Sequence, residues 1–131
     1  MDYINSQAAQ ALKLPFSQAV RVGDILYLSG ALGNAPGKLE VVPGGIEPET
    51  RQTMENVSAL LKENSLTFAD VFKCTVMLAD MAEWDTFNRI YVGYFEPGRL
   101  PARSAFGASG LALGARVELE FWAYAGKKAA R

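Results

Sequence analysis

Apolar and polar residues alternate with the period of a β-strand over several segments of the chain. Residues 18–30 predict a hairpin, because Gly23 and Asp24 lie between two alternating arms and suit a type II′ turn. Residues 71–79 predict a strand in which one face holds Phe72, Cys74, Val76 and Leu78. Residues 116–124 predict another strand, with one face formed by Val117, Leu119, Phe121 and Ala123 and the other by Arg116, Glu118, Glu120, Trp122 and Tyr124. Residues 102–108 predict a further strand.

Two segments carry apolar residues at helical spacing instead. The first helix is predicted to begin with Pro48 at its first position, to end near Asn64, and to bury Met54, Val57, Leu60 and Leu61. The second is predicted to follow Asp80, which forms a capping box with Glu83, and to end at Pro97. Its apolar stripe consists of Trp84, Phe87, Tyr91 and Phe95. The Gly- and Pro-rich residues 31–45 predict a long loop, with a short strand over residues 39–42 left open.

The order of these elements predicts an α+β fold that forms a single domain over residues 1–131. The simplest packing places both helices on one face of a mixed β-sheet. The opposite face then mixes charged residues with Trp122 and Tyr124, which is a large aromatic surface to expose to water. We therefore expect a partner subunit to cover this face. The alternative is a monomer in which both rings lie along neighbouring side chains.

The composition excludes several kinds of chemistry. The chain has no His, so the commonest metal ligand and the commonest general base near neutral pH are absent. We expect neither a metal site nor a Ser-His-Asp triad. The formal net charge is -1, and the only basic run, Lys127 and Lys128 with Arg131, is interpreted as a solvated tail, so we expect no nucleic-acid partner. The single cysteine, Cys74, lies on an apolar strand face and is expected to be inert.

The N-terminal segment lacks the basic start and apolar stretch of a secretory signal. No segment approaches the roughly 18 consecutive apolar residues of a membrane-spanning helix. A cytoplasmic protein without a membrane partner is therefore expected.

Arg103 is the first candidate for ligand binding, because it lies where a loop enters a predicted strand. Its guanidinium can bind a carboxylate through two parallel hydrogen bonds and stays charged at any working pH. Glu118, which has apolar neighbours in the last strand, is the candidate for orienting a water molecule or passing a proton. The alternatives are a solvated or ion-paired Arg103 and a cross-strand salt bridge for Glu118.

Asn88 and Gly30 are further candidates. Asn88 interrupts the apolar stripe of the second helix, so its amide needs hydrogen-bond partners, which a ligand or a neighbouring loop would supply. Gly30 follows a strand, where the missing side chain would allow a ligand to approach the backbone. A simple turn is the alternative at this position.

Several segments, taken in their order and spacing, resemble the Rid family (RidA or YjgF) of reactive-intermediate imine deaminases over nearly the whole chain. The segments that carry the resemblance are residues 15–20 (PFSQAV), Ser29-Gly30, Thr50-Arg51-Gln52 with Glu55-Asn56, residues 71–76 (VFKCTV), Phe87-Asn88 with Tyr91 and Phe95, Pro101-Ala102-Arg103-Ser104, and Val117-Glu118-Leu119-Glu120. Each segment is weak evidence alone, whereas their combination is specific.

The resemblance implies a chorismate-mutase-like fold and a homotrimer with active sites between subunits. It also implies hydrolysis of 2-imino acids, or of enamine tautomers such as 2-aminoacrylate, to 2-keto acids and ammonia without a metal or cofactor. By position, Arg103 would hold the substrate carboxylate and Glu118 would orient the attacking water. The backbones of Gly30 and Ala105 would contact substrate or water, and Asn88 would line the pocket.

The sequence departs from the family pattern at two positions of the implied pocket. Phe16 stands where the family usually has Tyr, and Ala31 stands where many members have Gln after Ser-Gly. Together, these two departures would make the pocket more apolar and would suit a bulkier or less polar imine. Two other functions stay open. One is a small-carboxylate-binding or regulatory protein without efficient catalysis. The other is an endoribonuclease or translation inhibitor, against which the acidic balance and the missing His argue.

Overall fold

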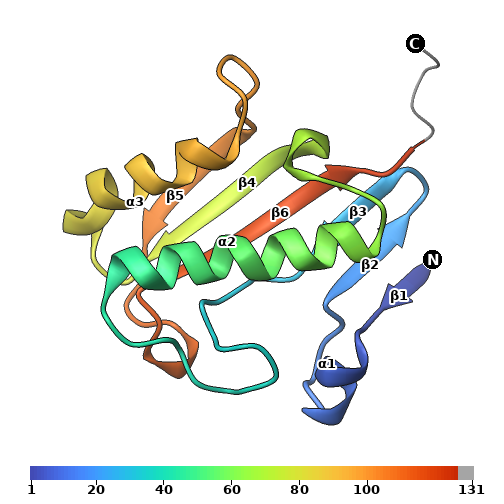
Figure 1. Ribbon diagram of the computed structural model, residues 1–131, viewed down its shortest axis with the longest axis horizontal. Coiled ribbons are helices and arrows are strands. Elements are labelled where there is room, and N and C mark those ends of the chain that lie inside the picture. Colours follow the sequence, from blue (N-terminus) through green and yellow to red (C-terminus); the bar gives the residue numbers. More distant parts are fainter. Residues whose placement is uncertain (127–131) are drawn as a thin grey trace.

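The alternating segments give each strand one apolar face, and pairing these segments builds one sheet. In the computed structural model, which describes residues 1–126, the sheet has six strands in the order β1-β2-β3-β6-β4-β5 (Figure 1). The strands are β1 (Asp2–Ile4), β2 (Ala19–Val22), β3 (Ile25–Leu28), β4 (Val71–Leu78), β5 (Ala102–Gly107) and β6 (Val117–Tyr124). β4 and β5 run parallel and the other neighbours antiparallel, so the sheet is mixed. The basic residues Lys127, Lys128 and Arg131 lie outside the described residues.

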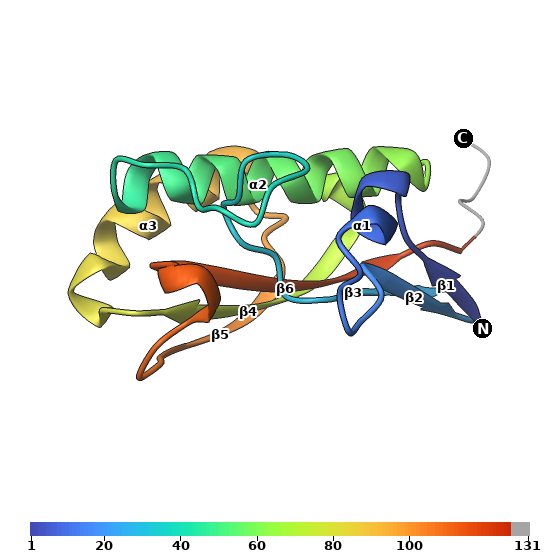
Figure 2. The same ribbon diagram turned by 90° about the horizontal axis from the view of Figure 1, so that it is seen from below.

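The two longer helices, α2 (Ile46–Glu63) and α3 (Trp84–Tyr91), cover one face of this sheet (Figure 2). The remaining helical segments are α1 (Gln7–Ala11) and the 3-10 turns η1 (Phe68–Asp70), η2 (Met81–Glu83), η3 (Val92–Tyr94) and η4 (Ala112–Gly114). The α2 residues Met54, Val57 and Leu61 are at most 1% exposed and belong to the core between helix and sheet. The expected α+β arrangement, with both helices on one face of a mixed sheet, is confirmed. Within residues 1–126, no helix combines the length and hydropathy needed to cross a membrane.

The hairpin and the last strand agree with their predictions. Gly23 and Asp24 join β2 to β3, and Gly23 has a φ of +59°, the positive value that a type II′ turn needs at its first central residue. In β6, the predicted apolar face is fully buried at Val117, Leu119, Phe121 and Ala123. The strict alternation of apolar and polar residues therefore correctly predicted which face of β6 is buried.

β4 departs from its predicted alternation at one residue. Phe72 does not share the buried face of Cys74, because a β-bulge between Val71 and Lys73 shifts the register. Phe72 is 41% exposed and lies beside the Trp122 ring of β6, whereas Val71 is buried in its place. The prediction for Phe72 is therefore wrong.

Other boundaries differ because short or irregular segments carry little periodicity. α2 begins at Ile46, so Pro48 is its third residue and not its first; it is tolerated there because the first N–H groups of a helix have no intrahelical partner. The second helix ends at Tyr91 and continues only as the 3-10 turn η3, so it stops before Pro97. No strand forms over residues 39–42, and β1 and α1 are additional elements.

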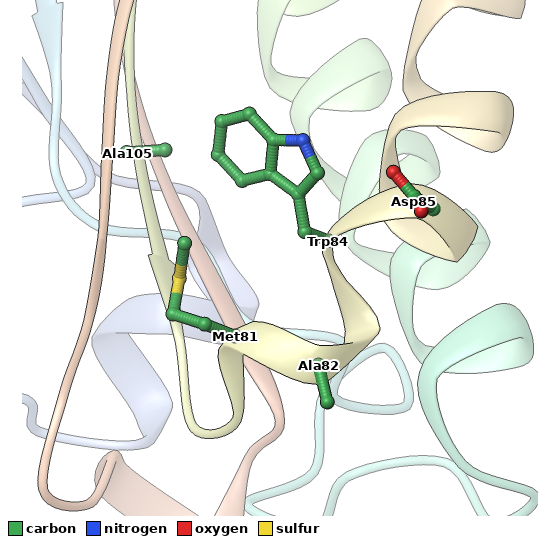
Figure 3. A pocket seen from close by; sticks show the side chains of 5 residues that line it. All are labelled: Met81, Ala82, Trp84, Asp85 and Ala105. Atoms are coloured by element: carbon green, nitrogen blue, oxygen red, sulfur yellow. The ribbon is translucent and has the colours of Figure 1, made fainter.

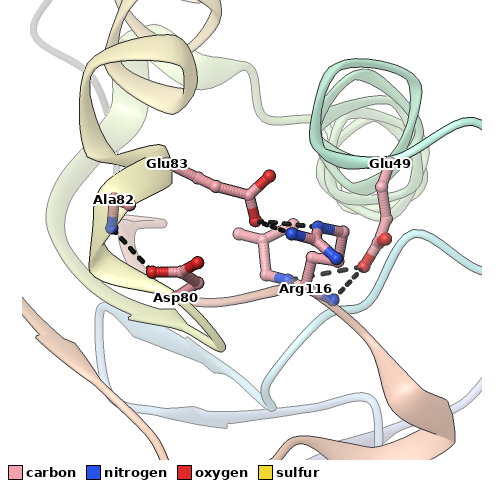
Figure 4. A network of polar contacts seen from close by, with 6 residues as sticks. Glu49, Asp80, Ala82, Glu83 and Arg116 are labelled. Carbon is pink, nitrogen blue, oxygen red and sulfur yellow. Dashed lines mark hydrogen bonds and ion pairs between the residues drawn. The ribbon is translucent and has the colours of Figure 1, made fainter.

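The predicted capping box of Asp80 and Glu83 does not form. Asp80 accepts a hydrogen bond from the Ala82 N–H over 2.9 Å at the start of η2. Glu83 instead binds the Arg116 guanidinium, whose Nε donates over 2.7 Å (Figure 4). This pair connects the beginning of α3 to the beginning of β6.

Glu49 of α2 holds the same end of β6 from the other helix. Its side chain is buried, and its Oε1 accepts hydrogen bonds from the backbone N–H groups of Arg116 over 2.6 Å and Val117 over 3.4 Å. A buried carboxylate that accepts backbone N–H groups replaces the water that these donors would lose on folding. Glu49 therefore fixes the start of the strand that carries Glu118.

Glu49→Ala is expected to lower the free energy of unfolding by about 3 kcal/mol, because it leaves buried N–H groups without an acceptor. Urea unfolding followed by circular dichroism measures the change. Glu47→Ala is the matched control, since Glu47 is exposed in the first turn of the same helix and should contribute less than about 1 kcal/mol. Equal losses in the two variants would contradict the role of Glu49.

Candidate active site

Arg103 points from the edge strand β5 toward the helix layer. It is in register with Cys74 of β4, which is fully buried on that face. The Arg103 Cζ lies 4.9 Å from the ring centroids of both Trp84 and Tyr91. The same Cζ lies 5.7 Å from the ring centroid of Phe87. All three rings belong to α3. Aromatic faces attract a guanidinium, and α3 therefore fixes this cation without neutralising it.

The positive charge of Arg103 is not compensated within the described part of the chain. Among residues 1–126, no carboxylate lies within ion-pair distance of its guanidinium. Burial raises the pKa of the neighbouring Cys74 thiol to about 12 and also raises the pKa of the Tyr91 hydroxyl, so both groups are neutral at physiological pH. The ion-paired alternative for Arg103 therefore does not apply within residues 1–126, and its guanidinium is a half-buried cation.

A shallow pocket of about 490 Å³ opens between β5 and the start of α3 (Figure 3). Its lining residues are Met81, Ala82, Trp84, Asp85 and Ala105. Trp84 connects this pocket to the cation, because the same side chain lines the pocket and lies over the Arg103 guanidinium. Ala105 is two residues beyond Arg103 in β5 and so shares its sheet face.

Asn88 lies on the face of α3 that carries the rings around Arg103, since it follows Trp84 by four residues and precedes Tyr91 by three. Its Oδ1 is buried and has no hydrogen-bond partner within residues 1–126. Within residues 1–126, this oxygen therefore does not accept the hydrogen bond from a neighbouring loop that was the alternative for Asn88. A buried amide oxygen without a partner can accept a hydrogen bond from a bound ligand or water.

Glu118 lies on the opposite, uncovered face of the sheet. It alternates with the buried Val117 and Leu119 of β6 and is in register with Met77 of β4. Gly30 packs so closely against the Glu118 carboxylate that a Cβ at position 30 would overlap Oε2. A side chain at position 30 would therefore have to displace the Glu118 carboxylate.

The environment of Glu118 favours its protonated form more than water does. Burial raises the pKa of its carboxyl, and the negative charge of Glu120 raises it further. Within residues 1–126, no Lys or Arg forms an ion pair with Glu118, so the cross-strand salt bridge is absent. A carboxylate with a raised pKa accepts a proton more readily near neutral pH than an ordinary Glu does.

Phe16 belongs to the same side of the molecule as Gly30. The carbonyl of Ser17 accepts a hydrogen bond from the Ser29 hydroxyl over 2.6 Å, which holds the loop of Phe16 beside the end of β3. Phe16 is 52% exposed, so it belongs to the surface of the single chain.

The predicted site residues consequently form two groups that do not meet within one chain. One group, on the helix-covered face, consists of Arg103, Asn88 and Ala105. The other group consists of Glu118 and Gly30, and the hydrogen bond between Ser29 and Ser17 joins the loop that contains Phe16 to the end of β3 beside it. Arg103 and Glu118 point to opposite faces of the sheet, because their register partners on β4 are separated by an odd number of residues.

The aromatic rings around Arg103 were predicted only as a packing stripe. Their helical spacing placed Trp84, Phe87 and Tyr91 on one face, but nothing in that spacing indicates which strand residue they surround. The polar interruption at Asn88 was the one local signal that this face does more than pack. Met81 and Asp85 of the pocket carried no signal in the sequence.

Comparisons with known proteins agree on one family. The family described as Endoribonuclease L-PSP matches residues 6–125. A Mus musculus protein named 2-iminobutanoate/2-iminopropanoate deaminase is 43% identical over 117 residues, which cover 89% of this chain and 86% of that protein. The solved structure of the E. coli YjgF gene product has a TM-score of 0.84 at 28% identity and covers 95% of this chain and 98% of its own. A Yersinia pestis protein of the conserved Rid family, YyfA, has a TM-score of 0.80 at 35% identity, with coverages of 84% and 87%.

Proposed function

This chain belongs to the Endoribonuclease L-PSP family, which includes the Rid and YjgF proteins, and on that premise we propose how its residues deaminate reactive imines. It is an enzyme of the 2-iminobutanoate/2-iminopropanoate deaminase type. Its substrates are 2-imino acids and their enamine tautomers, and its products are 2-keto acids and ammonia. Arg103 binds the substrate carboxylate, and Glu118 orients the attacking water and accepts its proton.

The observation that carries this proposal is the uncompensated cation at Arg103. Its guanidinium is fixed by the aromatic rings of α3 and has no carboxylate partner within residues 1–126. A bidentate pair with the carboxylate of an imino acid supplies the missing charge and orients the substrate plane. The adjoining pocket beside Trp84 and Ala105 then receives the substrate side chain.

The reaction needs positioning more than a strong base. A protonated imine is electrophilic at C2, so a water oxygen forms the new C–O bond while the C=N π electrons move to nitrogen. The Glu118 carboxylate accepts the proton that the water loses, then returns a proton to the amino group. As the C–N bond breaks, its electron pair leaves with ammonia. The hydroxyl oxygen at C2 forms the C=O bond and gives its proton to the Glu118 carboxylate, so the 2-keto acid remains. In this proposal, the Oδ1 of Asn88, which is buried and without a partner within residues 1–126, and the backbones of Gly30 and Ala105 supply further hydrogen bonds to the substrate or the water.

We also propose that the active enzyme is a cyclic homotrimer of chorismate-mutase-like subunits, with each site built between two neighbours. Arg103 and Glu118 lie on opposite faces of one sheet, so a single site needs Arg103 from one subunit and Glu118 from the next. The uncovered face also carries an aromatic cluster in which Tyr27 and Phe72 flank Trp122 and remain 37% and 41% exposed. Covering such a cluster with a second copy removes apolar surface from water.

Mixing two inactive variants is expected to restore activity if the sites lie between subunits. After an equal mixture of Arg103→Ala and Glu118→Gln is unfolded and refolded together, about a quarter of the sites should contain both intact residues. Ammonia release should rise to roughly that fraction of the wild-type rate, whereas each variant refolded alone should stay inactive. A refolded mixture that is no more active than the two separate variants would contradict sites shared between subunits. Analytical ultracentrifugation of the wild-type protein measures the number of subunits.

The activity itself is tested with imines generated in situ by an amino-acid oxidase or dehydratase. The wild-type chain is expected to accelerate ammonia release, with substrates ranging from 2-iminopropanoate to imines with larger apolar side chains. Phe16 leads us to include the larger members. No acceleration with any imine, together with binding of small carboxylic acids, would favour a regulatory carboxylate-binding protein instead.

An RNA-cleaving function is a separate candidate, in view of the family description. The absence of His and the formal net charge of -1 argue against it. RNA cleavage by protein freed of trace nuclease, lost in a point variant, is the result that would support this function.

A further inference from the structure

The polar face of α2 carries a chain of side-chain amides that reaches the loop of residues 31–34. The Gln52 Nε2 donates to the Asn56 Oδ1 over 2.8 Å. The Asn56 Nδ2 in turn donates to the backbone carbonyls of Leu32 and Asn34, each over 3.0 Å. One half-buried amide therefore satisfies two loop carbonyls, and a second amide fixes its orientation.

This loop is coupled directly to the strand that carries Glu118. The Ala31 N–H donates to the Leu119 carbonyl over 2.7 Å, and the Leu119 N–H donates to the Ala31 carbonyl over 3.0 Å. Gly30, one residue earlier, lies against the Glu118 carboxylate. A displacement of residues 31–34 therefore changes the space and the hydration around Glu118.

Asn is the side chain whose chemistry fits this position. Its Nδ2 provides two N–H donors for the two carbonyls, and its Oδ1 accepts from Gln52. Within residues 1–126, neither carbonyl accepts a backbone N–H, because the bridge between Asn34 and Val41 uses the Gly33 carbonyl instead. Loss of Asn56 would leave both carbonyls to water and would remove these side-chain hydrogen bonds between α2 and the loop.

We propose that Asn56, oriented by Gln52, is a positioning residue for the deaminase site, because it clamps residues 31–34 so that Gly30 and Glu118 keep their relative placement. The inference rests on the proposed function and adds to it a residue that touches no substrate atom. Asn56 affects the position of Gly30 and Glu118, the residues that are proposed to orient the water. It does not affect the position of Arg103, which is proposed to bind the substrate carboxylate.

The test replaces Asn56 with Leu, which removes the donors without adding a charge. Asn64→Leu is the matched control, because the Asn64 Nδ2 also donates to a backbone carbonyl from α2, that of Leu60 over 2.8 Å, far along the helix from the loop. In steady-state assays, Asn56→Leu is expected to lower kcat about 10- to 100-fold and to change KM less than about threefold. Asn64→Leu should retain wild-type kcat and KM.

A pH profile separates positioning from a merely structural role. If the loop opens, water reaches Glu118 and its raised pKa falls toward that of an ordinary Glu. The fall of kcat at acidic pH, the acidic limb of the profile, should therefore occur at a lower pH in Asn56→Leu than in the wild type. In Asn64→Leu it should occur at the wild-type pH. A structural role alone would lower the melting temperature and the folded fraction without moving this limb.

Gln52→Met is the second variant, for use if Asn56→Leu does not fold. It keeps the donors of Asn56 but removes their orientation, so the same changes are expected at smaller amplitude. Wild-type kcat and an unmoved acidic limb in the folded variant would overturn the inference while wild-type deamination stands. A wild-type chain that hydrolyses no imine would overturn the proposed function first, and the positioning role with it.

Discussion

Arg103→Ala is expected to lose about 10²–10⁴-fold in kcat/KM for imine hydrolysis. Each hydrogen bond from a charged donor to the substrate carboxylate contributes about 1.5–3 kcal/mol, and the guanidinium can make two of them. No other cation lies among the aromatic rings of α3 in the described part of the chain, so no neighbour replaces it. Initial rates of ammonia release over a substrate series measure the loss.

Two controls distinguish the carboxylate contact from a general loss of charge or of packing. Arg99→Ala removes an exposed arginine whose one ion pair within residues 1–126, with Glu96 over 3.9 Å, lies at the surface, and it should leave kcat/KM unchanged. Arg103→Lys keeps the charge but cannot form the bidentate pair, so its loss should be intermediate. Thermal unfolding of each variant shows how much of the change reflects the lost contacts with Trp84 and Tyr91. Unchanged turnover in a folded Arg103→Ala would contradict the carboxylate role.

Glu118→Gln is expected to lower kcat by about 10²–10⁴-fold, the usual range for a group that transfers protons in the rate-limiting step. Gln keeps the shape beside Gly30 but cannot accept the proton of the attacking water. Stopped assays at a fixed pH, with the imine generated faster than it is consumed, measure kcat directly. Wild-type kcat in Glu118→Gln would contradict the assignment.

The pH dependence gives a second readout of Glu118. The carboxylate is active when ionised, so kcat should fall as the pH drops through its pKa, which burial and Glu120 hold above that of an ordinary Glu. This acidic limb should disappear in Glu118→Gln. In Glu120→Gln the repulsion is gone, so the limb should move to lower pH while activity is retained. An unmoved limb in Glu120→Gln would show that a different group titrates.

Local patterns predicted the elements with a regular period and failed where the period breaks. β6 alternates strictly, so the buried set that ends at Ala123 was correct. The bulge in β4 inserts one residue, which moves Phe72 to the uncovered face, and no feature of the local sequence marks that insertion. The capping-box spacing of Asp80 and Glu83 was present, but a long-range partner, Arg116, binds Glu83 instead.

The candidate site was only partly accessible from the sequence. Residue type and position made Arg103 and Glu118 candidates, with a solvated or ion-paired arginine and a cross-strand salt bridge as the alternatives. Only the resemblance to the Rid family favoured the functional interpretation. The relation between the two residues was not accessible. It depends on the register by which β4 pairs with β5 on one side and with β6 on the other.

The sequence by itself determined which residues face the core in regular strands and helices, that histidine chemistry is absent, and which polar residues are candidates for a site. The tertiary structure alone decided that aromatic rings surround Arg103, that Glu118 lies on the other face of the sheet, and that Asn56 holds the loop beside it. The physical reason is the range of the interactions. Periodicity reports the contacts of a residue with its own element, whereas sheet register and helix packing join segments that are distant in the chain.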